Sequence, residues 1–206
     1  MPTLGKFLII SPLKSEVDRF FEGAAKNNVE VYAPTDEDNT KTSDLLRLLH
    51  QNKSICTTHA MYLRLASIVR ADKSILDGYT IIIDEVPTPV EPAPNIASKD
   101  FDLVLLNMDF IEIDPKTHQV RPTEKWEKLM VAGATRFYPE TFKAAMSGRL
   151  YTQDGNLFIL AIPVELISAG SRLEIMTYLS KGSLIRAYLE KIGASYEIDK
   201  LPEDVE

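Results

Sequence analysis

Short apolar runs and amphipathic segments alternate four times within the first 86 residues, and this alternation constrains the fold more than any other feature. The length and β-branched content of the apolar runs predict buried strands at residues 6–11, 29–34, 54–58 and 79–85. Helical spacing predicts helices at residues 15–27, 44–52 and 59–72. The sequence therefore predicts an α/β fold, with a mostly parallel sheet covered by helices on both faces.

The second half of the chain is less regular. Its patterns predict helices at residues 101–110, 124–133, 139–148 and 183–193, a small hairpin or loop at 111–122, a hairpin turning at Asp154–Gly155, and strands at 171–179 and 194–200. We expect one domain over residues 1–206. Its core would comprise residues 6–86 and 150–197, and residues 87–149 would form a helical and loop region resembling an insertion.

Composition excludes several classes of protein. The net charge of -7 argues against binding nucleic acid through bulk positive charge, so any such binding needs a local patch. The single cysteine, Cys56, excludes an internal disulfide and a cysteine-based zinc site, which suits a reducing cytosol. No run of about 18 apolar residues occurs, so we expect no membrane span. The expected location is the cytoplasm, or the host cytoplasm if a phage encodes the chain.

Polar side chains follow several of the expected strands at the point where each strand ends. These residues are Ser11, Thr57, Thr58, Asp84 and Glu85. Because the carboxyl ends of parallel strands share one edge of a sheet, we expect the five residues to converge there. Adjacent acids at such an edge suit nucleotide hydrolysis, in which one carboxylate holds Mg²⁺ through water and the next orients or deprotonates the attacking water. A solvated strand end is the plainer alternative.

The order of four segments, "FLIISP", "ICTTHA", "TIIIDEV" and "LEIMTYLSKGS", resembles the first RecA-like domain of superfamily-two (DEAD-like) helicases, especially phage-type ones. The resemblance covers roughly residues 6–197. It implies contact with the nucleic-acid backbone, DNA or RNA, by Ser11, Pro12, Thr57, Thr58 and His59. It further implies that Asp84 holds Mg²⁺ through water, that Glu85 activates water, and that Thr177 couples ATP hydrolysis to movement.

The sequence departs from this family in several respects: the second RecA-like domain is missing, and Val86 and Pro87 follow the two acids where the family usually has Ala or Cys and then His or Asp. The sequence also departs in the respect that matters most for activity. It contains no phosphate-binding loop of the form G-x-x-x-x-G-K-[ST]. We therefore expect a RecA-like sheet that is incomplete at the phosphate-loop strand, and an isolated chain that neither binds ATP tightly nor hydrolyses it. Either the sheet closes over the gap, another strand fills it, or a second chain supplies that strand together with the second RecA-like domain. A truncated or split gene, an expression fragment and a degenerate homologue all remain open as explanations.

Two other functions stay open at this point. The first is a non-catalytic α/β interaction protein derived from such a domain, in which Asp84 and Glu85 are dispensable. The second, ranked lower, is an ATPase domain of the packaging-motor type. The individual residues also have structural interpretations: His59 as a helix cap or a packed histidine, and Thr57 and Thr58 as strand formers.

Overall fold

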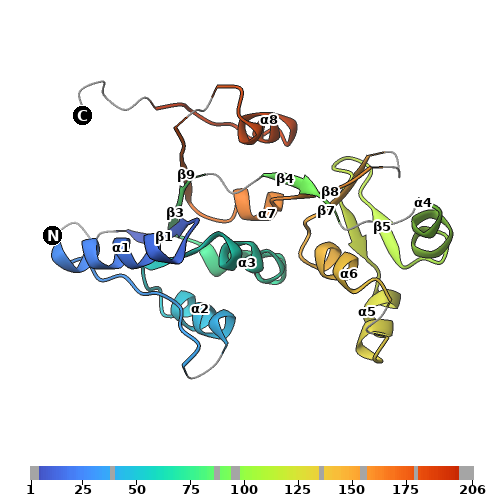
Figure 1. The fold of residues 1–206 in the computed structure, drawn as a ribbon, viewed down its shortest axis with the longest axis horizontal. Helices are drawn as coiled ribbons and strands as arrows, with labels where there is room; N and C mark the ends of the chain where they lie inside the picture. Colours follow the sequence, from blue (N-terminus) through green and yellow to red (C-terminus); the bar gives the residue numbers. More distant parts are fainter. Residues whose placement is uncertain are drawn as a thin grey trace.

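The structure is a computed structural model of the chain, and it describes residues 5–37, 40–85, 89–93, 98–134, 137–153, 157–178 and 181–199. Its larger lobe is built on a four-stranded sheet in the order β2-β1-β3-β9. The strands are β1 (Lys6–Ser11), β2 (Ile55–Thr58), β3 (Tyr79–Asp84) and β9 (Arg172–Met176), and every neighbouring pair is parallel (Figure 1). The predicted α/β class is confirmed.

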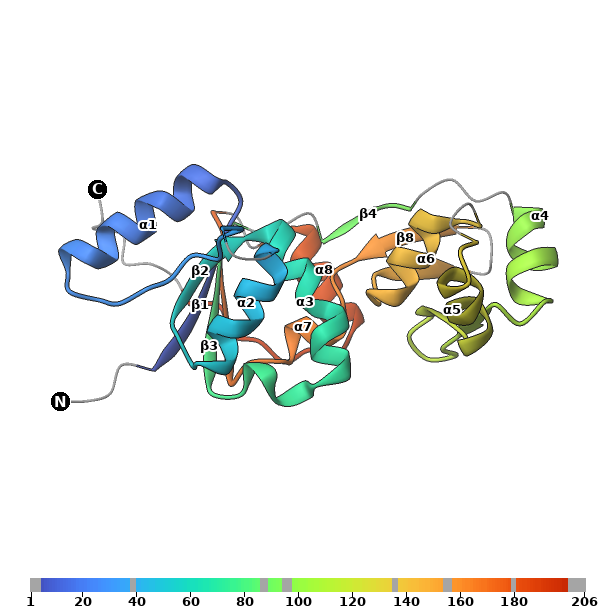
Figure 2. The ribbon, with the colours of Figure 1, turned by 90° about the horizontal axis from the view of Figure 1, so that it is seen from below.

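Helices cover both faces of this sheet, and the alternation of buried and half-buried residues along β3 shows that one face is covered more completely than the other. On one face, Leu8 and Ile10 of β1 and Ile81 of β3 are fully buried against α2 (Lys41–His50) and α3 (His59–Ala71). The short helices η1 (Lys73–Leu76) and α7 (Val164–Ile167) and helix α8 (Leu184–Lys191) lie on the same side. The other face is covered by α1 (Lys14–Lys26), as Figure 2 shows.

Two of the strands predicted from sequence do not form. In the segment 29–34 only Tyr32 pairs with β2, through an isolated bridge to Ile55. Asn28, just before it, has a φ of 54°, so the chain enters this segment from a left-handed turn rather than an extended run. Tyr32 nevertheless occupies the outer edge of β2, exchanging backbone hydrogen bonds with Ser54 and Cys56. Residues 194–199, where the last strand was expected, form no strand.

A smaller lobe lies between β3 and β9 in the sequence. It contains a three-stranded antiparallel sheet of β4 (Val90–Pro92), β8 (Leu157–Ala161) and β7 (Leu150–Gln153), and a hairpin of β5 (Ile111–Ile113) and β6 (Val120–Pro122). The helical segments are α4 (Ser98–Asp100), the π-helix η2 (Phe101–Leu106), α5 (Glu124–Val131) and α6 (Pro139–Met146). Its described residues overlap the expected insertion at 87–149 and continue to residue 161.

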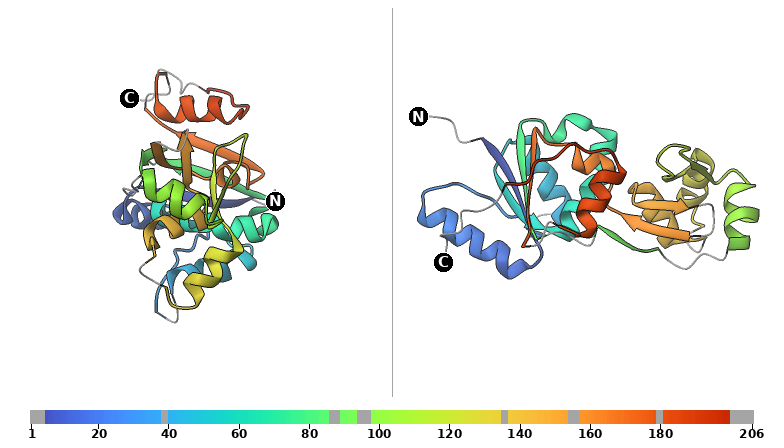
Figure 3. Two further views of the ribbon diagram at one scale, coloured as in Figure 1. Left: turned by 90° about the vertical axis from the view of Figure 1, so that its right-hand side faces the viewer. Right: turned by 90° about the horizontal axis from the view of Figure 1, so that it is seen from above.

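This smaller lobe has a hydrophobic core of its own. Trp126 and Phe101 are fully buried in it. The Trp126 ring contacts the rings of Phe137 and Phe142 directly, at centroid distances of 6.2 and 5.2 Å. The two lobes lie end to end, joined by β4 and β8 (Figure 3). The strands of the predicted hairpin, β7 and β8, do pair antiparallel, while its turn at Asp154–Gly155 lies outside the described residues.

Gly170 allows the chain to enter β9 close to β3. A Cβ atom at this position would come within 2.9 Å of the Tyr79 carbonyl oxygen and of the Ile81 side chain. We expect Gly170→Ala to lower the free energy of unfolding by about 1–3 kcal/mol, because a backbone atom has to move. Gly23→Ala is the matched control: it lies in α1 facing open space and should raise stability by about 0.5–1 kcal/mol. Urea denaturation measures both, and unchanged stability of Gly170→Ala would contradict the close approach.

Candidate functional site

The strand register brings the ends of four strands to one level. Ser11 pairs with Thr58 of β2, and Asp84 pairs with Met176 of β9. One step earlier, Ile10 pairs with both Thr57 and Ile83. The edge formed by these carboxyl ends is called the carboxyl rim below. It unites the residues from β1, β2 and β3 that the sequence singled out, and Thr177 follows β9 at the same edge.

Asp84 is the last residue of β3, one of the two central strands, and Glu85 follows it directly. Asp84 is half-buried and Glu85 is exposed. Neither carboxylate forms an ion pair or a side-chain hydrogen bond with a residue that the structure describes, apart from the attraction both exert on His59. The two acids are therefore not consumed by internal salt bridges, and their oxygen atoms remain available to a ligand.

The backbone at Glu85 is in a left-handed conformation, with a φ of 56°. A residue other than glycine held there typically stores about 1–3 kcal/mol of strain, and such strain concentrates at functional sites. The left-handed turn ends β3 immediately after Asp84.

His59 ties helix α3 to the end of β3. Its Nε2 lies 3.2 Å from the Asp84 carbonyl oxygen. Because a carbonyl only accepts, this contact requires the proton on Nε2. Burial lowers the pKa of His59, and the backbone carbonyls of Asp84 and Glu85 partly oppose that shift. The imidazole thus positions the acidic strand end, and the nucleic-acid contact implied for it stays a prediction.

The hydroxyl groups of the rim differ in accessibility. Ser11 is fully buried, and its Oγ has no hydrogen-bond partner among the described residues. Thr57 is also buried, with 3% of its surface exposed. Pro12 and Thr58 are half-buried and Thr177 is exposed. Of the residues expected to touch nucleic acid, Pro12, Thr58 and His59 are therefore the ones that reach the surface, whereas Ser11 and Thr57 lie beneath it.

The side chains available as metal ligands at the carboxyl rim limit which metal ion it could hold. Among the described residues, no group of three or more His, Cys, Asp or Glu side chains is arranged to hold a metal ion. Two free carboxylates fit Mg²⁺, which keeps several waters and typically takes one or two protein carboxylates alongside phosphate oxygens.

Burial, together with the charges of Asp18 and Asp84, raises the pKa of the Cys56 thiol to about 12, so this thiol is protonated at neutral pH and is no nucleophile.

A second polar cluster lies between the lobes, and the sequence did not single it out. Arg70 of α3 donates to the Met146 carbonyl oxygen at 3.2 Å and lies 3.5 Å from Glu165 of α7. Buried Gln119 connects the β5–β6 hairpin to Gly148. The partners are 29 to 95 residues apart in the sequence, so no local pattern could have indicated the cluster.

Comparisons with protein-family models, curated proteins and solved structures find no match to this chain. Within the part of the chain that the structure describes, no helix is both long and apolar enough to cross a membrane.

The lowered pKa of His59 predicts how stability depends on pH. The unfolded chain binds a proton at His59 near pH 6.5, whereas the folded chain binds it only at lower pH. Acidification from about pH 7.5 to about pH 5 should therefore lower the free energy of unfolding of the wild-type protein. The His59→Gln protein should lack this part of the pH dependence. Urea denaturation of both proteins measures the difference, and an NMR titration gives the pKa directly. A His59 pKa at or above 6.5 would contradict the assignment.

Proposed function

We propose that this chain is the first RecA-like domain, or a piece of one, of a helicase-type ATPase that depends on nucleic acid. The observation that carries the proposal is the carboxyl rim, where two adjacent unpaired acids end a central parallel strand beside the ends of β1, β2 and β9. Open α/β sheets bind their ligands at this edge. The order of segments along the chain, which resembles superfamily-two helicases, supports the same function.

The two acids would have different tasks. Asp84, half-buried and next to β9, would hold Mg²⁺ through water, and Glu85, exposed on its left-handed turn, would orient or deprotonate a water molecule. Mg²⁺ supplies charge neutralisation at the ATP phosphates when bound. His59 would contact neither Mg²⁺ nor the attacking water directly, because its Nε2–H donates a hydrogen bond to the Asp84 carbonyl oxygen. Thr177 would couple hydrolysis to movement from the neighbouring strand.

The phosphate-binding half of such a site would come from outside this sequence. A bound triphosphate is normally held by backbone amides and a lysine of a phosphate loop, and the 206 residues contain no such motif. β9 offers a place for the missing strand: it pairs with β3 on one side, and no described strand pairs with its other side. A partner chain could add a strand there by backbone hydrogen bonding.

An interaction protein without catalysis is the second candidate, and one surface favours it. The small lobe exposes apolar side chains on and after η2, with Leu103 at 62% and Met108 at 49% exposure. Apolar surface of this kind is common at protein interfaces. If this candidate holds, replacement of both Asp84 and Glu85 by alanine leaves partner binding intact.

The isolated chain should not hydrolyse ATP at a measurable rate, with or without single-stranded DNA or RNA. Neutralising the phosphates is a large part of catalysis in this class of enzyme, and the groups that do so are missing here. A steady-state phosphate-release assay of the purified chain, with Glu85→Gln as the control, measures this. Turnover that Glu85→Gln abolishes would contradict the expectation, because the chain would then hold a complete site.

Nucleic-acid binding at the carboxyl rim is tested by placing a negative charge there. Thr58→Asp puts a carboxylate at the half-buried N-cap of α3, where aspartate is a good capping residue, so the fold should tolerate it. Repulsion of phosphate groups should weaken binding of a labelled single-stranded oligonucleotide about tenfold, equivalent to about 1.4 kcal/mol. Ser67→Asp, exposed on the same helix, is the matched control. Fluorescence anisotropy in low salt measures both, and equal affinities would remove the rim as the binding surface.

A further inference from the structure

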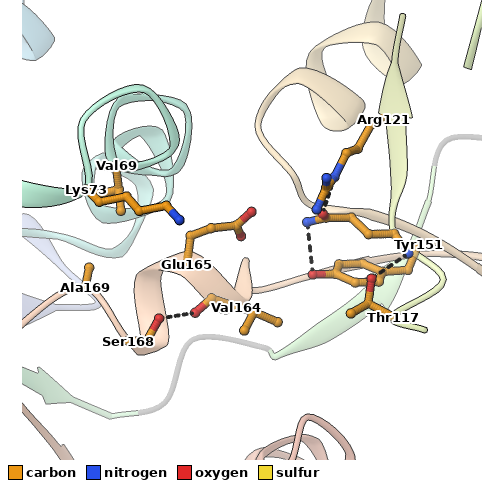
Figure 4. A pocket seen from close by; sticks show the side chains of 10 residues that line it. Val69, Lys73, Thr117, Arg121, Tyr151, Val164, Glu165, Ser168 and Ala169 are labelled. Atoms are coloured by element: carbon orange, nitrogen blue, oxygen red, sulfur yellow. Dashed lines mark hydrogen bonds between the residues drawn. The ribbon is translucent and has the colours of Figure 1, made fainter. Parts of the chain in front are cut away.

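A cavity of about 280 Å³ lies between the two lobes, at the opposite end of α3 from the carboxyl rim (Figure 4). Three parts of the chain line it: the end of α3 and the start of η1, helix α7, and the strands β6 and β7 with the loop before β6. Its walls combine apolar and charged side chains, namely Val69, Val164, Ala169, Lys73, Arg121 and Glu165. The volume is close to the lower end of the range for small-molecule sites.

Arg121 is held in place at this cavity by a chain of hydrogen bonds that starts at a buried amide. Gln119 is 3% exposed, and its Nε2 donates to the Gly148 carbonyl at 2.8 Å and to the Tyr151 hydroxyl at 3.3 Å. With both amide hydrogens engaged, its Oε1 accepts from Arg121 Nε at 2.9 Å. Among the described residues, Asp114 is the one ionic partner of the terminal guanidinium nitrogens, at 4.0 Å from one of them. The hydrogen bond from Nε to Gln119 therefore orients the guanidinium group, while its terminal N–H groups make no hydrogen bond to a described residue.

Arg70 compensates only part of the negative charge of Glu165, because Glu165 Oε2 is buried and has no hydrogen-bond partner among the described residues. Arg70 lies 3.5 Å from Glu165 Oε1, and its second terminal nitrogen donates to the Met146 carbonyl. Lys73 Nζ, in contrast, forms no hydrogen bond or ion pair with any residue that the structure describes. Figure 4 shows Lys73 and Arg121 approaching from opposite sides, with Glu165 between them. Three cationic side chains, Arg70, Lys73 and Arg121, thus lie at or beside the cavity against the two carboxylates of Glu165 and Asp114, which leaves one positive charge in excess on a chain whose net charge is -7.

We propose that this cavity binds a small organic anion, a phosphate or carboxylate attached to an apolar group. Arg121 would grip the anionic oxygens with two parallel N–H groups, and Lys73 would add a point charge from the other side. The apolar part would pack on Val69 and Val164. Lys73 belongs to the larger lobe and Arg121 to the smaller one, so the bound anion joins the two lobes. The site is separate from the carboxyl rim and does not depend on the function proposed for it.

Isothermal titration calorimetry with the full chain tests the proposal, using phenyl phosphate, benzoate and inorganic phosphate as probes. Phenyl phosphate and benzoate share an apolar ring and differ in the anionic group, so their ratio of affinities identifies that group. Weaker binding of inorganic phosphate than of phenyl phosphate shows that the apolar walls contribute. We expect Lys73→Met and Arg121→Met each to weaken the better aromatic probe by about tenfold or more, as expected for loss of one charged contact.

Lys26→Met at the end of α1 and Arg19→Met on the same helix are the matched controls, because both residues are exposed and α1 covers the face of the sheet opposite to α3 and α7. Lys73 is exposed and the Arg121 side chain is 41% exposed, so their replacement should leave the fold intact, which circular dichroism verifies. The proposal is overturned if neither phenyl phosphate nor benzoate binds saturably to the wild type. It is equally overturned if the Lys73→Met and Arg121→Met proteins bind as tightly as the controls.

Discussion

Parallel pairing of β1, β2, β3 and β9 is the constraint on which the rest of the structure depends. Because all four strands run in one direction, their last residues end at the same level, and residues far apart in the sequence become neighbours. Ser11 and Thr58 are paired through this register, and so are Asp84 and Met176. A slip of one residue in any pair would turn the apolar side chains of that strand to the opposite face, so burial of residues such as Leu8 and Ile81 also fixes the candidate site.

Much of this arrangement was predictable from sequence, because it rests on local patterns. The apolar runs at 6–11 and 79–85 form β1 and β3 almost to the residue, and the helical spacing after His59 forms α3. The strand predicted at 29–34 was wrong, because β propensity is a property of the residue and does not show whether a neighbouring strand pairs with it. In this segment only Tyr32 pairs with β2. The convergence of the acids with the ends of β1 and β2 followed from topology, which the alternation of elements had already indicated.

The remainder depends on contacts that no local pattern encodes. Ser11 and Thr57 are buried although both are polar and lie at strand ends, and the hydrogen bond from His59 to Asp84 joins residues 25 apart in sequence. The left-handed backbone of Glu85 could not be anticipated, since glutamate has no preference for it. In the smaller lobe, the sequence indicated individual helices around Trp126 but not that they share a core separate from that of the parallel sheet.

The smaller lobe leaves and rejoins the larger one at a single place. Pro89 accepts a hydrogen bond from the Ile162 amide at 3.2 Å, and Val90 pairs with Ala161 immediately beyond. The chain therefore passes into the smaller lobe and returns from it at adjacent positions, as in a domain inserted into a loop of another domain. Such a module can be gained, exchanged or deleted in evolution without moving the strands of its host, because closing the gap takes only a short turn. The parallel sheet and the appended lobe are therefore free to diversify at different speeds.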